Sequence, residues 1–208
     1  MIIIDGSEGE GGGQVLRYAC ALSLLTGEPF TIENIRGGRE KPGLMRQHVT
    51  ATEAACLIGG AECTGLAVGS TSISFRPGAV TPGDYHFAVG TAGSTGLVLQ
   101  TVLVPLMLAN APSRLVIEGG THALAAPPFD FIERTLLPVI NRMGPTITAK
   151  LVRHGFFPRG GGRIEIDIEP APLRAIGCIE RGAAGPVQAT AIIAGIPFDV
   201  ADRELKAA

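Results

Sequence analysis

Hydrophobic residues follow two different periods along the chain, and the changes of period predict alternating strands and helices. Short runs of aliphatic residues, as at residues 2–4, favour strands, whereas apolar residues three and four positions apart favour amphipathic helices. Gly27 and the pair Gly59 and Gly60 each follow a helical pattern, where glycine commonly ends a helix. The pattern predicts strands at residues 2–4, 30–34, 61–68 and 72–76 and helices at residues 14–25 and 44–58.

The same order of elements returns in the second half of the chain. Pro29 and Pro112 precede equivalent strands, and Gly60 and Gly144 follow equivalent helices, at nearly the same separation. Because landmarks at a fixed period indicate an internal duplication, we predict an α+β fold of tandem β-α-β-α-β-β repeats. Each repeat is expected to form a four-stranded sheet with two helices on one face. Strands are predicted at residues 85–89, 114–118, 146–153 and 163–168, with helices ending near residue 108 and spanning residues 130–143.

The pattern weakens after residue 172. Apolar residues at 175–179 and 187–194 predict two further strands, and Asp199 is placed to cap a helix that reaches residue 208.

Composition and charge narrow the classes of function. Hydrophobic residues make up 46% of the chain and charged residues 17%, which argues against disorder and coiled coils. The formal net charge of −2 argues against an overall basic surface, so any contact with nucleic acid must be local. The N-terminus does not resemble a secretory signal, and the most apolar run, residues 97–109, is too short to cross a bilayer. We expect a cytoplasmic protein without a membrane segment, its four cysteines as reduced thiols.

A glycine cluster, DGSEGEGGGQVLR at residues 5–17, lies between a predicted strand and a predicted helix. Backbone N–H groups in such a turn, together with the helix N-terminus, can hold an anion. The cluster lacks the lysine of a P-loop and the third glycine of a dinucleotide fingerprint, so a tight turn alone is an equal alternative. Glu10 is a candidate ligand for a divalent metal, or else a solvated loop acid.

A basic segment follows the second strand, at residues 35–48. Its cations are Arg36, Arg39, Lys41 and Arg46. The segment contains only one acid, Glu40, so its net charge is positive and its cations can bind phosphate oxygens. Gln47, His48 and Arg17 are placed to join them. The alternatives are a solvated charged loop and, for Arg17, a surface salt bridge.

The equivalent segment of the second repeat, GGTHALAAPPFDF at residues 119–131, is nearly uncharged. Its prolines and phenylalanines, Pro127 and Phe131 among them, suit an apolar wall for a flat base, or else pack in the core. Gln100 interrupts the most apolar helix, so it is either bonded locally or directed at a ligand. His154 opens the turn HGFFPRGGGR, and a structural role is expected for it.

Taken together, these segments resemble the RNA 3′-terminal phosphate cyclase family. The matching motifs, in order over about residues 1–200, are EGEGGGQVLR, IRGGREKPGLMRQH, GTAGSTGLVLQT, AAPPFDFI and RHGFFPRGGG. The resemblance implies an ATP-consuming ligase of RNA processing that converts an RNA 3′-terminal phosphate to a 2′,3′-cyclic phosphate. In such enzymes a histidine takes AMP from ATP and passes it to the RNA 3′-phosphate, and the neighbouring 2′-hydroxyl then displaces AMP.

The same resemblance gives each candidate residue a role. Glu10 resembles the ligand of a divalent metal, Mg²⁺ or Mn²⁺, while Gln100, Pro127 and Phe131 resemble the residues around the adenine nucleotide of ATP. The partner is the 3′ end of an RNA. Contacts to phosphate and substrate are implied for Arg17, Arg36, Arg39, Gln47 and His48.

The resemblance also implies what this sequence lacks. Family members have three such repeats, with a smaller domain inserted between the second and third, and their nucleophilic histidine lies in the third. Residues 1–84 and 85–172 correspond to the first two repeats, and residues 173–208 to a truncated start of the inserted domain. We therefore expect no catalytic nucleophile in this chain, and exposed apolar surface that favours self-association or a C-terminal partner segment.

Two other functions stay open at this stage. A non-catalytic, cyclase-like RNA-binding module in ribosome assembly would keep the same basic cluster. An enolpyruvyl transferase has a similar architecture and would bind phosphoenolpyruvate without ATP, although these motifs do not resemble those of that family.

Overall fold

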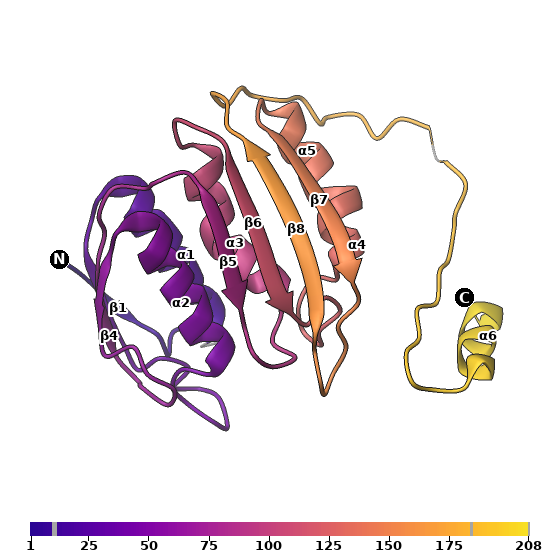
Figure 1. Cartoon of the computed structure of the whole chain (residues 1–208), viewed down its shortest axis with the longest axis horizontal. Helices are drawn as coiled ribbons and strands as arrows, with labels where there is room; N and C mark the ends of the chain where they lie inside the picture. Colours follow the sequence, from indigo (N-terminus) through magenta and orange to yellow (C-terminus); the bar gives the residue numbers. More distant parts are fainter. Residues whose placement is uncertain (10–11, 184, 208) are drawn as a thin grey trace. The chain divides into compact units, whose positions relative to one another are not determined.

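Two four-stranded sheets with the same strand order, together with their helices and loops, make up most of the protein (Figure 1). The computed structural model describes residues 1–9, 12–183 and 185–207. The chain divides into two compact units, Met1–Arg174 and Ala175–Ala208, and the first of these holds both sheets.

The first repeat consists of β1 (Ile2–Asp5), α1 (Gly13–Thr26), β2 (Phe30–Glu33), α2 (Arg46–Gly59), β3 (Glu62–Thr64) and β4 (Ile73–Arg76). Its strands lie in the order β1-β2-β4-β3, with β1 parallel to β2 and the other neighbours antiparallel. Both helices end at the predicted glycines, Gly27 and Gly60, which adopt left-handed backbone angles.

The second repeat consists of β5 (Asp84–Ala88), α3 (Thr95–Met107), β6 (Ser113–Gly119), α4 (Phe129–Phe131), η1 (Ile132–Leu136), α5 (Leu137–Arg142), β7 (Thr146–Arg153) and β8 (Gly162–Glu169). Its order, β5-β6-β8-β7, repeats the first sheet, again with one parallel pair, β5 and β6, followed by antiparallel pairs. The predicted fold class is therefore confirmed.

The helix predicted at residues 130–143 is divided into three parts. A π-helical turn, η1, separates α4 from α5, and the Leu137 amide donates to the carbonyl of Ile132, five residues earlier. Pro138 follows directly and has no N–H group, so it cannot continue the ordinary helical ladder. The wider turn before the proline accounts for the difference from the prediction.

Helix α3 joins the two repeats into one core. It packs on α1 and α2 of the first repeat and on β6 and β8 of its own. A helix with neighbours on several sides needs apolar residues around most of its circumference, as the sequence of α3 provides. The sheets contribute buried side chains such as Ile32 and Phe75 from the first repeat and Ile117 and Ile166 from the second.

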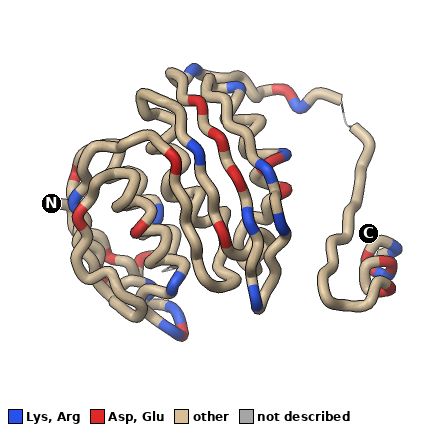
Figure 2. The backbone as a smooth tube through the Cα atoms, viewed as in Figure 1, with Lys and Arg blue, Asp and Glu red and all other residues tan. Residues whose placement is uncertain are grey.

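The opposite face of the second sheet is charged. Along β6 and β8, buried and solvent-facing residues alternate, and Figure 2 shows acidic and basic positions following these strands. Arg114 pairs with Glu165 at 3.1 Å, and Arg163 pairs with the same carboxylate at 2.9 Å. The sheet face is therefore solvated, and the candidate chemistry lies in the loops.

Residues 175–208 form the second unit, described here by itself. Its helix is α6 (Phe198–Ala207), and Asp199 lies in the first turn of that helix rather than before it. The strands predicted at residues 175–179 and 187–194 are wrong: the described residues there form no strand. Ile179 and Val187 are 96% and 97% exposed, so no neighbouring strand covers the apolar residues that suggested the pattern.

None of the helices in the described part of the chain is long and apolar enough to cross a membrane.

The alternation along β6 gives a matched test of the fold. Ile117 is fully buried, whereas its neighbour Val116 lies on the other face and is half-buried. We expect Ile117→Ala to lower the free energy of unfolding by about 2–5 kcal/mol, because it leaves a cavity in the core. Val116→Ala should cost about 1 kcal/mol or less, since it removes little buried surface. Urea unfolding measures both, and equal losses would contradict this assignment of the two faces.

Candidate functional site

The glycine cluster leads from β1 into α1 and leaves the start of this helix suited to an anion. Gly12 is the N-cap residue and has no side chain with which to cap the first N–H groups, and the first turn holds no acidic residue. Such N–H groups and the positive end of the helix dipole attract an anion. Glu10, the predicted metal ligand, lies outside the described residues.

Arg17, in α1, is a buried cation that links the two repeats. Its side chain is 8% exposed, and its Nε donates to Oε1 of Gln100 on α3 at 2.9 Å. Gln100 Nε2 in turn donates to the Tyr18 hydroxyl at 3.0 Å. Burial lowers the pKa of Arg17, and none of the described carboxylates counters this effect. The surface salt bridge considered for Arg17 is therefore not formed by the described residues, and a charged guanidinium stays near the start of α1.

His48 lies in the first turn of α2 and is 3% exposed. Its Nδ1 accepts the Met45 N–H at 3.0 Å, so the proton of the neutral ring is on Nε2. Nε2 is also the atom that a β-carbon at Gly13 would meet first, which places it against the start of α1. Burial, followed by the charges of Arg36 and Arg17, lowers the pKa of His48 to about 4. At neutral pH His48 thus presents an uncharged N–H donor to the same place.

Arg39 and Arg36 share the basic loop but are used differently. An Arg39 Nη atom lies 3.4 Å from the position of a β-carbon at Gly12, so this guanidinium reaches the start of α1. Arg36 has a left-handed φ of 57°, and its Nη1 donates to the carbonyls of Lys41 at 2.7 Å and Gly43 at 2.9 Å. Arg36 therefore closes the loop, while Arg39 extends toward the glycine cluster.

Gln47 does not face this cluster. It packs on Gly93 in the loop between β5 and α3, where a β-carbon would lie 2.9 Å from Gln47 Cβ. Its side chain lines a separate cavity, together with that of Arg36.

Of the three residues assigned to the adenine nucleotide, Gln100 and Pro127 lie along one face of α3. The Pro127 carbonyl is 3.6 Å from the position of a β-carbon at Gly96, one helical turn before Gln100. Phe131 ends α4 and is 45% exposed. Phe131 and Pro127 thus belong to the second repeat, whereas Arg17, Arg39 and His48 belong to the first.

The cluster formed by Gly12, Gly13, Arg17, Arg39 and His48 is suited to binding a polyphosphate. Two guanidinium groups, a neutral N–H donor and a helix start converge on it, and donors of this kind form strong hydrogen bonds with phosphate oxygens. Within the described residues no group of three metal-binding side chains is present.

Sequence reasoning missed Tyr18 and the bond from His48 to Met45 N–H. Tyr18 follows Arg17 directly, but its partner Gln100 lies on another helix, and no local pattern indicates such a pairing. The Met45–His48 spacing is that of an N-terminal capping box, with histidine where Glu or Gln is usual.

Comparison with known proteins identifies the family of this chain. A family model described as RNA 3′-terminal phosphate cyclase matches residues 8–200. A protein of that name from Koribacter versatilis (strain Ellin345) is 56% identical over 209 residues, covering 100% of this chain and 59% of the relative. A second, from Ralstonia nicotianae (strain ATCC BAA-1114 / GMI1000), is 52% identical over 208 residues, covering 99% of this chain and 60% of the relative.

A third, from Ectopseudomonas mendocina (strain ymp), is 51% identical over 204 residues, covering 98% of this chain and 59% of the relative. The chain thus spans about three fifths of the length of these curated relatives. By the match over residues 8–200 and by these identities, the chain belongs to the RNA 3′-terminal phosphate cyclase family.

Proposed function

We propose that this chain carries the nucleotide- and phosphate-binding part of an ATP-dependent RNA 3′-terminal phosphate cyclase. The reaction converts an RNA 3′-phosphate to a 2′,3′-cyclic phosphate through an adenylylated enzyme and an adenylylated RNA. The supporting observation is Arg17, a buried cation without a described carboxylate partner beside an uncapped helix start. Burying such a charge is costly unless it is paired, and a bound phosphate group would supply the partner and complete the hydrogen bonding of the guanidinium.

In this proposal Arg17, Arg39 and the Nε2–H of His48 bind phosphate oxygens, and the Gln100–Pro127 face of α3 lies against the adenine nucleotide. Each nucleotidyl transfer moves negative charge among phosphate oxygens, and donors fixed in advance stabilise that charge without reorganising. The Arg17 guanidinium is fixed by the hydrogen bond that it donates to Gln100, and the His48 ring by the hydrogen bond that it accepts from Met45 N–H.

The nucleophilic histidine is proposed to lie outside these residues. A nucleophile needs a ring nitrogen with a free electron pair, but His48 Nδ1 accepts the Met45 N–H and Nε2 holds the proton. His86 lies 3.4 Å from Glu118 on the outer face of the second sheet, away from the glycine cluster. His122 and His154 stack on each other in the second repeat, with ring centres 5.4 Å apart.

A divalent metal, Mg²⁺ or Mn²⁺, is proposed to accompany ATP. Mg²⁺ is commonly held by one or two carboxylates together with substrate phosphates and water, so the single acid Glu10 in the glycine cluster is compatible with it. The metal would neutralise phosphate charge.

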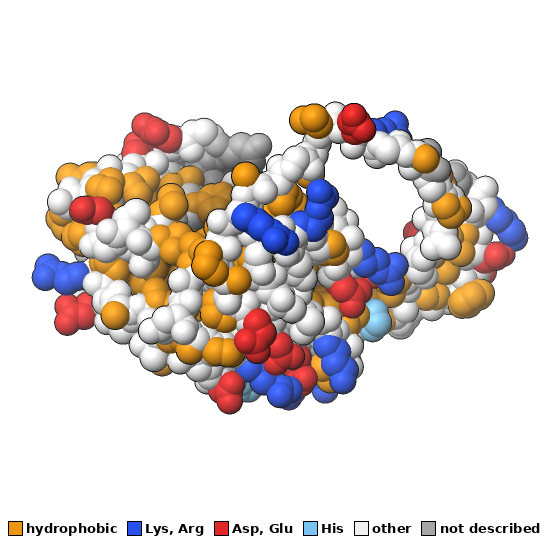
Figure 3. All heavy atoms as spheres, turned by 90° about the horizontal axis from the view of Figure 1, so that it is seen from above, with side chains coloured by type: hydrophobic (Ala, Val, Ile, Leu, Met, Phe, Trp, Pro, Cys, Tyr) orange, Lys and Arg blue, Asp and Glu red, His pale blue; other side chains and the backbone are white. Residues whose placement is uncertain are grey.

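An apolar stripe on α1 supports the proposal of a further protein segment or a second copy packing here. Tyr18, Leu22 and Leu25 lie on one side of the helix and are 44%, 57% and 39% exposed. Figure 3 shows hydrophobic side chains gathered over the first repeat. Exposed apolar residues grouped in this way mark interaction surfaces.

Replacement of Arg17 tests the phosphate site. We expect Arg17→Met to weaken ATP binding about ten- to a hundredfold, because one or two charge-assisted hydrogen bonds are lost. Stability should be unchanged or higher, since methionine packs where a charge without a described carboxylate partner was buried. Calorimetric titration with ATP and Mg²⁺ and thermal unfolding measure the two effects, with Arg76→Met, at the exposed last residue of β4, as the control.

Unchanged ATP affinity in Arg17→Met would contradict the site. Incubation with α-phosphate-labelled ATP tests the nucleophile separately, and we expect ATP binding without acid-labile label on the chain. Protein-bound AMP would show that a nucleophile lies within this chain and would contradict this part of the proposal.

The buried His48 predicts a pH-dependent loss of stability. Its pKa is about 4 in the folded protein, against an ordinary value of 6.5 for an unfolded chain, so the unfolded state binds more protons between these values. As pH falls from 6.5 to 4, His48 therefore lowers the free energy of unfolding by about 3 kcal/mol. Asparagine can still accept the Met45 N–H but cannot be protonated. The advantage of wild type over His48→Asn should shrink by about this amount between pH 7 and pH 4, and a constant difference would refute the assignment.

A further inference from the structure

A cavity of about 800 Å³ opens where loops of both repeats meet. The first repeat contributes the basic loop, the first turn of α2 and residues 68–69, and the second contributes residues 91–93, 123–124 and 157–158. Figure 1 shows the ends of β5 and β6 and the β7–β8 hairpin along this edge of the protein. The volume is in the range of small-molecule sites.

One wall of the cavity is cationic. Arg36, Lys41 and Arg46 line it, and none of the described lining residues is a carboxylate. Arg36 is fixed by its two bonds to loop carbonyls, and an Arg46 Nη atom lies 3.5 Å from the position of a β-carbon at Gly90, across the cavity edge. A cationic wall held in this way suits a phosphate group.

The remaining rim is apolar and exposed. Its large side chains are exposed to the following extents: Phe157 84%, Leu124 98%, Val68 60% and Met45 46%. They come from four separate segments but line the same cavity. Large apolar side chains that converge on one cavity and stay exposed mark a binding surface.

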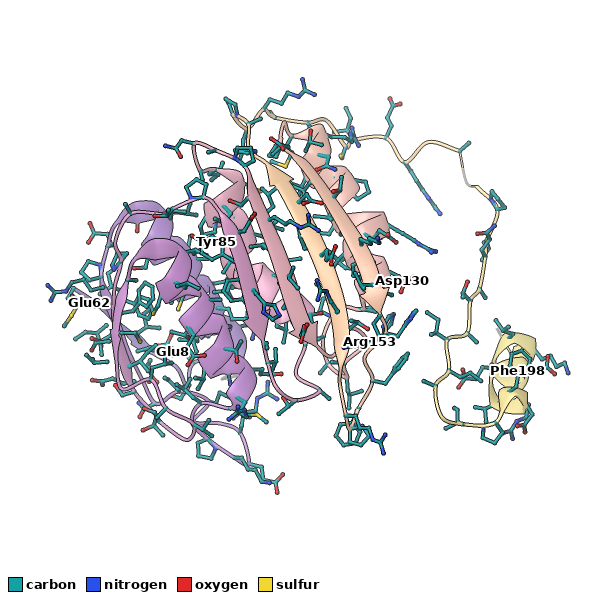
Figure 4. All side chains as sticks on the ribbon, viewed as in Figure 1. Glu8, Glu62, Tyr85, Asp130, Arg153 and Phe198 are labelled. Carbon is teal, nitrogen blue, oxygen red and sulfur yellow. The ribbon has the colours of Figure 1, made fainter. Side chains whose placement is uncertain are left out.

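A stack of three rings holds two of these segments in place. His122 lies 5.4 Å from both His154 and Phe156, measured between ring centres, and the rings are nearly parallel. His122 Nε2 also lies 2.9 Å from Asp130 Oδ2, and Asp130 is labelled in Figure 4 at the start of the helical stretch. Leu124 lies two residues after His122 and Phe157 directly after Phe156, so the stack anchors the backbone segments that carry these two rim residues.

We propose that this cavity binds an unpaired nucleotide of the RNA upstream of its 3′ end, with the base on Phe157 and Leu124 and a backbone phosphate at Lys41 and Arg46. The inference rests on the proposed function. A flat base on apolar side chains with cations alongside is how single-stranded nucleic acid is commonly bound. A cavity of this volume accommodates one base, whereas a duplex would have to be unpaired first.

The position of the cavity favours RNA over ATP as the occupant. Gln47 lines the cavity, and the next residue, His48, faces Gly13 at the phosphate cluster. Two sites on consecutive residues of one helical turn suit a polymer, whose terminal phosphate lies at one site while its preceding nucleotide lies at the other.

Two variants of the full 208-residue chain test the cavity. The probe is a short single-stranded RNA with a 3′-phosphate and a 5′-fluorescein, followed by fluorescence anisotropy. Phe157→Ala should weaken RNA binding about five- to a hundredfold through lost stacking. Lys41→Ala should reduce the slope of log affinity against log salt by about 0.7. ATP affinity should not change in either variant, and Phe198→Ala and Lys150→Ala, at exposed positions outside the cavity, serve as controls.

The outcomes separate the two proposals. RNA affinity equal to wild type in Phe157→Ala and Lys41→Ala, with weaker binding in Arg17→Met, overturns the cavity and leaves the phosphate site standing. A parallel fall in ATP and RNA affinity also overturns it, since the cavity would then serve ATP. A wild-type chain that binds neither ATP nor RNA overturns the proposed function and the cavity together.

Discussion

The buried guanidinium of Arg17 is the constraint on which the candidate site depends. Removing a charge from water is costly, and the described residues offer it the neutral oxygen of Gln100 rather than a carboxylate. That oxygen is available because α3 of the second repeat packs directly on α1 of the first. The stability of the shared core therefore offsets the cost of keeping this cation buried.

The neighbouring groups are consistent with this constraint. His48 stays uncharged at neutral pH because burial and the nearby arginines lower its pKa to about 4. Its ring can therefore donate a hydrogen bond next to Arg17 without adding a further buried positive charge. The first turn of α1 likewise contains no acid that would neutralise the guanidinium. His48 and Arg39, the described side chains that reach the start of α1 beside Arg17, are thus neutral and positive respectively.

Much of the fold could be predicted from local patterns, but the partners within the site could not. The helix ends at Gly27 and Gly60 follow from glycine chemistry, and the repeated strand order follows from the matched landmarks. The strands expected after residue 172 fail because an alternating apolar pattern forms a strand only where another strand is available to pair. The bond between Arg17 and Gln100 joins residues on separate repeats, so no spacing in the sequence indicates it.

The duplication explains how a single cavity comes to have one cationic wall and one apolar wall. Both repeats place a loop after their second strand, at equivalent positions of sheets with the same order. In the first repeat this loop carries the cations, and in the second it is nearly uncharged and contains Pro127 and Leu124. Residues of both loops line one cavity, Arg36 and Lys41 from the first and Ala123 and Leu124 from the second, so this cavity has both a charged and an apolar lining. A polynucleotide, which alternates charged phosphates with flat apolar bases, matches both, and this match is the physical reason for favouring RNA at this edge of the protein.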